Sequence, residues 1–202
     1  KHLNFMSYRI EKKLFIQKEN FFEFKKKLIE KDAKKIFKDR EVSSLYFDNF
    51  KKEMFHDSLE GLTPRKKIRI RNYPKDFNKK LLFETKISSV EGRFKTNKLI
   101  NEKYFGVITR NGIFDNKYGI CKPILNVNYN REYFKMGDVR ITLDSNIFYE
   151  LYNGRFIKKD LRIVAELKTS INKNLDELAE IYPFQEIRFS KYCNGIELFN
   201  RG

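Results

Sequence analysis

Basic side chains occupy every second position of one short segment, in which Arg65, Lys67, Arg69 and Arg71 alternate with other residues. Alternate side chains of a β-strand point to the same side of a sheet, so these cations would share one face. Their mutual repulsion along the strand is relieved when an anion binds between them. Arginine forks bind phosphate oxygens in pairs, so a pair such as Arg69 and Arg71 suits phosphate as that anion.

A second pattern, Glu-x-Lys, recurs along the chain and places an acid and a base on the same side of a strand. When the predicted strands are sorted by face, basic residues far outnumber acidic residues on the face that these pairs share. The pairs are Glu11/Lys13, Glu84/Lys86 and Glu166/Lys168. The other basic residues of this face are Arg9, Arg65, Lys67, Arg69, Arg71, Arg93, Lys95, Arg131 and Arg140, and its remaining acid is Asp144.

Two arrangements explain a charged strand face. An antiparallel sheet commonly has one apolar and one solvated face, and alternation alone favours this ordinary explanation. The run of cations, and the sparse Thr, Ser and Gln beside them, favour instead a barrel that encloses the charged face. A barrel of about eight strands has room inside for side chains or one slim ligand. Uncompensated ions buried there cost several kcal/mol each, so the ligand would be a thin polyanion such as a triphosphate or polyphosphate. Duplex nucleic acid is too wide.

The few carboxylates among these cations have a chemical role of their own. Glutamate oxygens are ligands for hard divalent cations, which also coordinate phosphate oxygens and water. The pattern therefore indicates a metal site, for Mn²⁺ or Mg²⁺, beside the phosphate-binding cations.

The composition of the whole chain agrees with a polyanionic partner. Its 202 residues include 43 Lys and Arg against 27 Asp and Glu, a formal net charge of +16. Such an excess indicates nucleic acid, anionic lipid, nucleotide or polyphosphate as the partner. Aromatic residues make up 15% of the chain, which excludes wholesale disorder. The scarcity of His and Cys argues against histidine-based nucleophilic catalysis, a disulfide framework and a zinc site, and no glycine-rich phosphate loop occurs. No apolar segment could span a membrane and no signal core begins the sequence, so we expect a cytoplasmic protein.

Hydrophobic periodicity predicts the elements that position these residues. Alternation predicts about eight short antiparallel strands, and helical spacing predicts helices between them. The predicted strands are 8–16, 43–48, 67–73, 81–88, 93–99, 127–134, 139–144 and 163–170, and the predicted helices are 18–27, 50–59, 102–109, 175–181 and 191–199. No linker divides the chain, so we expect a single α+β domain over residues 1–202, dominated by an antiparallel sheet or barrel.

The chain resembles the polyphosphate polymerase, or VTC-type, branch of the triphosphate tunnel metalloenzymes. The matching motifs follow the family's order from residue 8 to residue 192, and the ordered set is more specific than any single motif. The first four are Arg9-Ile10-Glu11-Lys12-Lys13, Ser44-Leu45-Tyr46-Phe47-Asp48, Arg65-Lys66-Lys67-Ile68-Arg69-Ile70-Arg71-Asn72-Tyr73 and Leu82-Phe83-Glu84-Thr85-Lys86. The others are Tyr129-Asn130-Arg131, Arg140-Ile141-Thr142-Leu143-Asp144, Ala165-Glu166-Leu167-Lys168 and Ser190-Lys191-Tyr192.

The resemblance implies a closed antiparallel tunnel of strands with helices packed outside. It implies a metal-dependent enzyme that transfers the terminal phosphate of a nucleoside triphosphate, ATP in the first instance, to a growing polyphosphate chain. By matching position, the catalytic cations would be Arg69, Arg71, Lys86, Arg131 and Lys168. Substrate phosphates would also be bound by Arg9, Lys13, Arg65, Lys67, Lys95, Arg140 and Lys191. Glu166 would be the main metal ligand, together with Glu11 or Glu84.

Other functions stay open. A triphosphatase of the same architecture would use water as the acceptor, but such enzymes carry Glu-x-Glu-x-Lys in the first strand, where this chain has Arg9 in place of the first Glu. A non-catalytic polyphosphate-binding module would need the cations but not the glutamates among them. An RNA-binding sheet would use Tyr129 and Tyr133, beside Arg131, for base stacking. Asn97 departs from the alternation of basic residues that begins with Arg93 and Lys95, since another basic residue is expected at this position.

The resemblance also sets expectations about the surroundings of the enzyme. Nothing before the first strand resembles the inositol-phosphate-sensing domain of eukaryotic relatives, and nothing after the last helix resembles their membrane domain. We therefore expect a chain that makes polyphosphate but does not itself translocate it, with a membrane-associated protein as a candidate partner. The usage of Lys, Asn and Phe indicates a bacterial source with an AT-rich genome.

Overall fold

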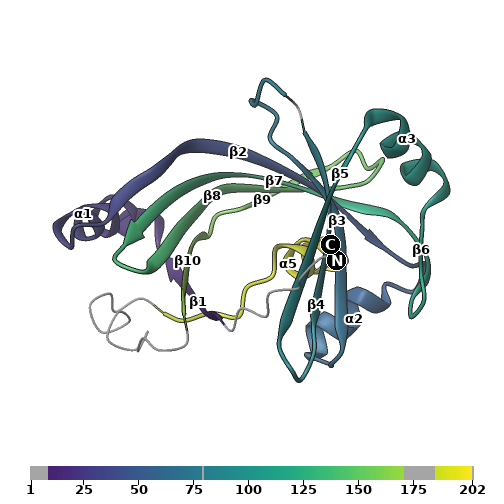
Figure 1. The fold of residues 1–202 in the computed structure, drawn as a ribbon, viewed down its shortest axis with the longest axis horizontal. Coiled ribbons are helices and arrows are strands. Elements are labelled where there is room, and N and C mark those ends of the chain that lie inside the picture. The colour runs from purple at the N-terminus through teal and green to yellow at the C-terminus, as the bar shows by residue number, and fades with distance from the viewer. Residues whose placement is uncertain (1–8, 79, 171–184, 202) are drawn as a thin grey trace, which may run out of the picture. The chain divides into compact units, whose positions relative to one another are not determined.

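The computed structural model describes residues 9–78, 80–170 and 185–201, which form an antiparallel sheet with short helices (Figure 1). Within these residues the strands are β1 (Arg9–Ile16), β2 (Lys34–Asp48), β3 (Arg65–Asn72), β4 (Leu81–Ser88), β5 (Arg93–Ile100), β6 (Ile113–Asp115), β7 (Gly119–Met136), β8 (Val139–Leu151), β9 (Ile157–Asp160) and β10 (Ile163–Ser170). The helices are the 3-10 helix η1 (Lys18–Asn20), α1 (Phe21–Glu30), α2 (Glu53–Glu60), α3 (Glu102–Asn111) and α5 (Lys191–Asn200). Hydrogen bonds join the strands in the order β1-β10-β8-β7-β2-β3-β4-β5, with β6 paired to β7 and β9 paired to β8.

The chain divides into two compact units. The first unit comprises Lys1–Arg40, Tyr129–Ile147 and Asp160–Phe189. The second unit comprises Glu41–Asn128, Phe148–Lys159 and Ser190–Gly202. The long strands β2, β7 and β8 contribute residues to both units.

In the first unit, strands β1, β8 and β10 have one apolar face, against which α1 packs. Phe24 and Leu28 lie one turn apart on α1, so both side chains reach the same side of the helix. They join Leu14 of β1 and Ile141 and Leu143 of β8 in one buried hydrophobic cluster. Burial of this apolar surface fixes which side of the strands faces the helix and leaves the polar residues on the other side.

The strand pairing places these polar residues opposite one another. In the β1–β10 ladder, Glu11 lies opposite Lys168 and Lys13 lies opposite Glu166. In the β10–β8 ladder, Glu166 lies opposite Thr142. The prediction that the Glu-x-Lys residues of β1 and β10 share one face is therefore confirmed.

In the second unit, β2, β3, β4 and β5 form consecutive antiparallel ladders. A buried carboxylate at the end of β2 starts the helix that follows, because Asp48 accepts hydrogen bonds from the backbone N–H groups of Met54 (3.1 Å) and Phe55 (2.9 Å). Gly61 ends this helix, α2, in the left-handed conformation with φ 81°, as glycine commonly does. The helix predicted over 50–59 is therefore present as α2 (Glu53–Glu60).

Helix α5 packs against β7 and β8 of the second unit through a glycine. A Cβ atom added to Gly195 would lie 2.6 Å from side-chain atoms of both Leu125 and Tyr149. Only glycine allows this approach, so α5 is held close to the strands and the residues at its start are placed with it.

The predicted strands within the described residues are present, but three are much longer than predicted. β8 continues to Leu151 rather than ending at Asp144. β2 begins at Lys34 rather than at Ser43, and β7 begins at Gly119 rather than at Val127. Most side chains in the first half of β2 are exposed, so this part lacks the alternation that marks a half-buried strand. The short strands β6 and β9 were not predicted, and the predicted helix 175–181 lies outside the described residues.

An antiparallel α+β architecture is confirmed, whereas the closed barrel is not. β1 and β5 end the hydrogen-bonded order, and no ladder joins them within the part of the chain that the structure describes. Alternation tells which side chains share a face, but it carries no information about whether two edge strands meet. No helix in the described part of the chain is long and apolar enough to cross a membrane.

Candidate functional site

The second unit carries a sheet surface dense in cations, which we call the basic face. It consists of Arg65, Lys67, Arg69 and Arg71 of β3, Lys86 of β4, and Arg93 and Lys95 of β5. Three lysines lie directly opposite one another across these strands, because Lys67 pairs with Lys86 and Lys86 pairs with Lys95. Like charges directly opposite each other destabilise a sheet, so an anion bound at this row would stabilise it.

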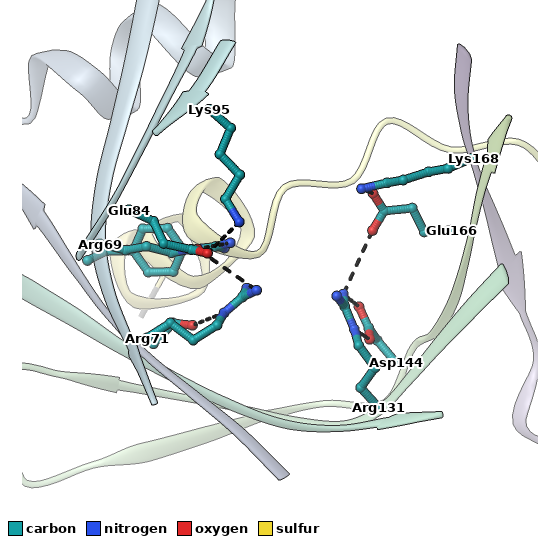
Figure 2. A network of polar contacts seen from close by, with 10 residues as sticks. Arg69, Arg71, Glu84, Lys95, Arg131, Asp144, Glu166 and Lys168 are labelled. Carbon is teal, nitrogen blue, oxygen red and sulfur yellow. Dashed lines mark hydrogen bonds and ion pairs between the residues drawn. The ribbon is translucent and has the colours of Figure 1, made fainter. Parts of the chain in front are cut away.

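One acid, Glu84, lies among the side chains that β3, β4 and β5 present on this face, and it contacts three of the cations (Figure 2). Its Oε2 atom lies 2.6 Å from both Nε and Nη2 of Arg69 and 3.9 Å from Nη1 of Arg71, while Oε1 accepts from Lys95. Burial alone would raise the pKa of Glu84, but Arg69 and Arg71, with the hydrogen bond from Lys95, lower it to about 2. Glu84 is therefore ionised at neutral pH and neutralises part of the basic face.

The two arginines are also held from the β2 side. Arg69 Nη1 donates a hydrogen bond to the Tyr46 hydroxyl at 2.9 Å, and Arg71 Nε donates to Ser44 Oγ at 3.4 Å. The Tyr46 ring stacks on Tyr192 with 5.1 Å between centroids. Burial would raise the pKa of Tyr46, but the charges of Arg69 and Arg71 lower it. The orientation of both guanidinium groups thus depends on partners other than Glu84 as well.

The start of α5 lies beside the basic face. Lys67 Nζ donates to Ser190 Oγ at 2.8 Å, and Ser190 caps α5 by accepting from the backbone N–H of Cys193. Lys191 is one of the cations that oppose burial and lower the pKa of Tyr46. The Ser-Lys-Tyr motif thus belongs to the same region as the cations of β3.

The first unit carries a second polar surface, which we call the mixed face because its acids and bases are paired. It consists of Glu11, Lys13, Arg131, Asp144, Glu166 and Lys168. Asp144 is 1% exposed, and its oxygens accept from Nε and Nη2 of Arg131 at 2.6 and 2.7 Å (Figure 2). Burial would lower the pKa of Arg131, but Asp144 keeps it well above its ordinary value.

Glu166 has cations on both of its oxygens. Lys168 Nζ lies 2.8 Å from Oε1, and Arg131 Nη2 lies 3.8 Å from Oε2. Glu11 extends the network, because Lys168 and Lys13 lie 3.8 and 3.5 Å from its two oxygens. Burial would raise the pKa of Glu166, but its contact with Glu11 and the charges of Lys168 and Arg131 hold it well below the ordinary range.

The donor set of the mixed face fits a metal ion that is shared with substrate. Among the residues that the structure describes, no group of three or more His, Cys, Asp or Glu side chains is placed to hold a metal. Mg²⁺ and similar ions often take only one or two carboxylates and complete their shell with substrate phosphates and water. Glu166 and Glu11, which both contact Lys168, are the pair that would hold such an ion.

Most of the predicted site residues lie on the basic face or the mixed face. Arg65 lies at the end of the basic face, and Arg9 and Arg140 belong to neither. Arg65 donates to the backbone oxygens of Gly61 and Leu62, both at 3.0 Å. Arg140 is exposed and lies opposite Lys168, and Arg9 pairs with Ser170 in the β1–β10 ladder. The phosphate-binding and metal-binding roles assigned from the sequence stay predictions.

Sequence reasoning assigned no role to Asp144 beyond its face, and none to Ser44. Both lie on strands whose alternation was recognised, but their partners Arg131 and Arg71 lie on other strands. Asp144 and Ser44 are recognised as partners of these arginines only when the pairing of the strands is known. Neighbours on adjacent strands are determined by strand register and not by spacing along one strand.

Comparison with known proteins identifies a matching family and proteins of similar fold. A family model described as the VTC domain matches residues 8–200. A solved structure from Vibrio parahaemolyticus, provisionally named an adenylate cyclase, has a TM-score of 0.60 and 15% identity and covers 95% of this chain and 98% of that one. A protein from Bacillus halodurans with the same provisional name has a TM-score of 0.59 and 14% identity, covering 90% and 93%. A conserved hypothetical protein from Pyrococcus furiosus has a TM-score of 0.57 and 16% identity, covering 92% and 99%. These identities show similarity of fold alone, and no curated protein matches the chain.

Proposed function

Because this chain belongs to the VTC domain family, we propose that it is a polyphosphate polymerase. In this proposal it transfers the terminal phosphate of a nucleoside triphosphate, ATP in the first instance, to the end of a growing inorganic polyphosphate chain. The observation that carries the proposal is the row of Lys67, Lys86 and Lys95 opposite one another on the basic face. Such a row suits an anion with several closely spaced charges, as a chain of phosphates has.

The cations of the chain would supply most of the catalysis. Phosphoryl transfer needs in-line positioning and stabilisation of charge on the phosphoryl oxygens, with little covalent chemistry from the protein. Arg69 and Arg71 would bind these oxygens, and the surrounding lysines would offset the repulsion between donor and acceptor phosphates. The acceptor is itself an anion and needs no strong general base, which agrees with a chain that has only 2 His.

Glu166 and Glu11 would hold a divalent metal, which would supply positive charge to phosphate oxygens bound at the mixed face. Lys168 and Lys13 already contact these two glutamates. The ammonium groups of these two lysines would bind phosphate oxygens at the same face. Arg131, locked by Asp144 in one orientation, would present its remaining N–H groups to the substrate.

The test is incubation of the purified chain with ATP and Mn²⁺, with free phosphate and long-chain polyphosphate measured together on the same samples. We expect a ladder of long chains that disappears when a chelator is added. Release of free phosphate without polyphosphate would identify the protein as a triphosphatase. If neither product forms, the protein is a non-catalytic polyphosphate-binding module.

Variants connect the activity to the two faces. We expect Glu166→Gln to abolish metal-dependent turnover and Arg71→Gln to weaken substrate binding. Lys98→Gln is the matched control for the loss of one positive charge, because Lys98 is exposed and lies opposite Phe83, on the other side of β5 from Lys95. Metal-dependent activity that survives in Glu166→Gln would remove this residue from the metal site.

A further inference from the structure

We propose that Glu84 is an internal counter-anion of the basic face, which occupies the place of a substrate phosphate and limits how tightly this face binds phosphate. The inference rests on the proposed function and adds to it a residue that sets affinity. The family resemblance implied that Glu84 could be a metal ligand, and this inference gives it a different role.

The contacts of Glu84 are those that a phosphate group would make on this face. Two N–H groups of Arg69 converge on one carboxylate oxygen at 2.6 Å, and Lys95 binds the other oxygen. The Glu84 residue is 2% exposed, so these contacts are shielded from water. A phosphate that binds Arg69, Arg71 and Lys95 has to compete with this carboxylate for the same donors.

Loss of the Glu84 charge would have two opposite effects on phosphate binding. The arginines would lose a partner that orients them, which weakens binding. The basic face would lose the acid that opposes its charge, which strengthens binding. Orientation is largely retained, because Tyr46 holds Arg69 at 2.9 Å and Ser44 holds Arg71 at 3.4 Å.

The magnitudes decide between these effects. One unit charge about 4 Å from a bound phosphate changes the binding constant by up to about a thousandfold at the effective dielectric of a protein surface. Loss of one hydrogen bond to a charged group changes it by about ten- to a hundredfold. We therefore expect removal of the Glu84 charge to tighten phosphate binding by about tenfold or more. A wild-type face of lower affinity would release a growing chain as it moves along.

The test is isothermal titration calorimetry of the full chain with sodium tripolyphosphate in the presence of EDTA, comparing wild type with Glu84→Gln. A metal ligand and a counter-anion have different signatures in this experiment. Without metal, loss of a metal ligand leaves the affinity unchanged, whereas loss of the counter-anion raises it by about tenfold. Thermal unfolding provides the second readout. Without ligand, Glu84→Gln should have a lower melting temperature than wild type. Tripolyphosphate should raise the melting temperature of Glu84→Gln by more than it raises that of wild type.

Asp115→Asn is the matched control. Asp115 is also a buried carboxylate of the second unit, 8% exposed, and it binds Lys66 of β3. Lys66 points to the side of β3 opposite to the basic face, because it lies between Arg65 and Lys67. This variant loses the same charge and some stability, but its affinity for tripolyphosphate should match that of wild type.

Unchanged or weaker binding by Glu84→Gln overturns the inference. If that variant does not fold, the same comparison is made between Lys95→Gln and the double variant that also carries Glu84→Gln. Tighter binding by the double variant supports the inference, and equal or weaker binding overturns it. The titration involves no turnover, so a chain that makes no polyphosphate but shows the expected tightening disproves the proposed function and retains the counter-anion role. Absence of tripolyphosphate binding by wild type overturns both.

Discussion

The acid dependence of folding measures how strongly the basic face is neutralised by Glu84. The pKa of this carboxyl is about 2 in the folded chain, against an ordinary value of 4.5, because Arg69, Arg71 and Lys95 outweigh the effect of burial. A difference of this size corresponds to about 3 kcal/mol of folding stability. The side chain is 3% exposed, so solvent screens this contribution only weakly. Because the pKa is lowered on folding, ionised Glu84 makes its full contribution to the free energy of unfolding above pH 4.5. This contribution is lost as the pH falls towards 2.

Urea unfolding of wild type and Glu84→Gln, followed by circular dichroism from pH 7 to pH 3, measures this contribution. At pH 7 we expect wild type to be more stable by about 3 kcal/mol. Between pH 4.5 and pH 3 the difference should narrow by about 2 kcal/mol, because the unfolded wild-type chain binds a proton there that the folded chain does not. Contributions of other carboxyl groups cancel in the difference. A difference in stability that stays constant with pH would show that Glu84 acts through packing rather than through its charge.

Three further substitutions test other parts of the structure. Asp144→Asn removes the buried partner of Arg131 and should lower the free energy of unfolding by about 3 kcal/mol in urea denaturation; a loss below about 1 kcal/mol would contradict the paired geometry. Lys86→Gln removes the middle lysine of the row, so stability should stay equal or rise while calorimetry shows several-fold weaker binding of tripolyphosphate; unchanged affinity would exclude Lys86 from the site. Gly195→Ala places a methyl group against Tyr149 and should lower stability by about 2 kcal/mol in thermal unfolding despite the better helix propensity of alanine, whereas a gain would show that α5 can move away from the strands.

The faces of the strands were predictable because alternation is a local property. The four cations of 65–71 had to share a side once that segment formed a strand, and the structure has them so. The apolar partners Ile68 and Ile70 are buried on the other side. The end of α2 was equally predictable, because Gly61 adopts the left-handed conformation that other residues avoid.

The first half of β2 was not predictable in this way. Its side chains from Lys34 are mostly exposed, so no alternation between apolar and polar residues marks it as a strand. Its neighbour in the sheet is β7, because the ladder with β3 involves only residues 43–47, and such a partner leaves no local trace in the sequence.

The sequence alone established that this chain has alternating strands, with cations and glutamates gathered on one side of them and apolar residues on the other. Spacing along one strand is enough to establish this, because it follows from the geometry of the backbone. The partner of each charge depended on the folded chain. Glu84 and Asp144 look alike as acids on a basic face, but strand register places the first against Arg69 and Lys95 and the second against Arg131. Register arises from packing between segments far apart in sequence, and the distances that set charge interactions exist only after those segments have paired.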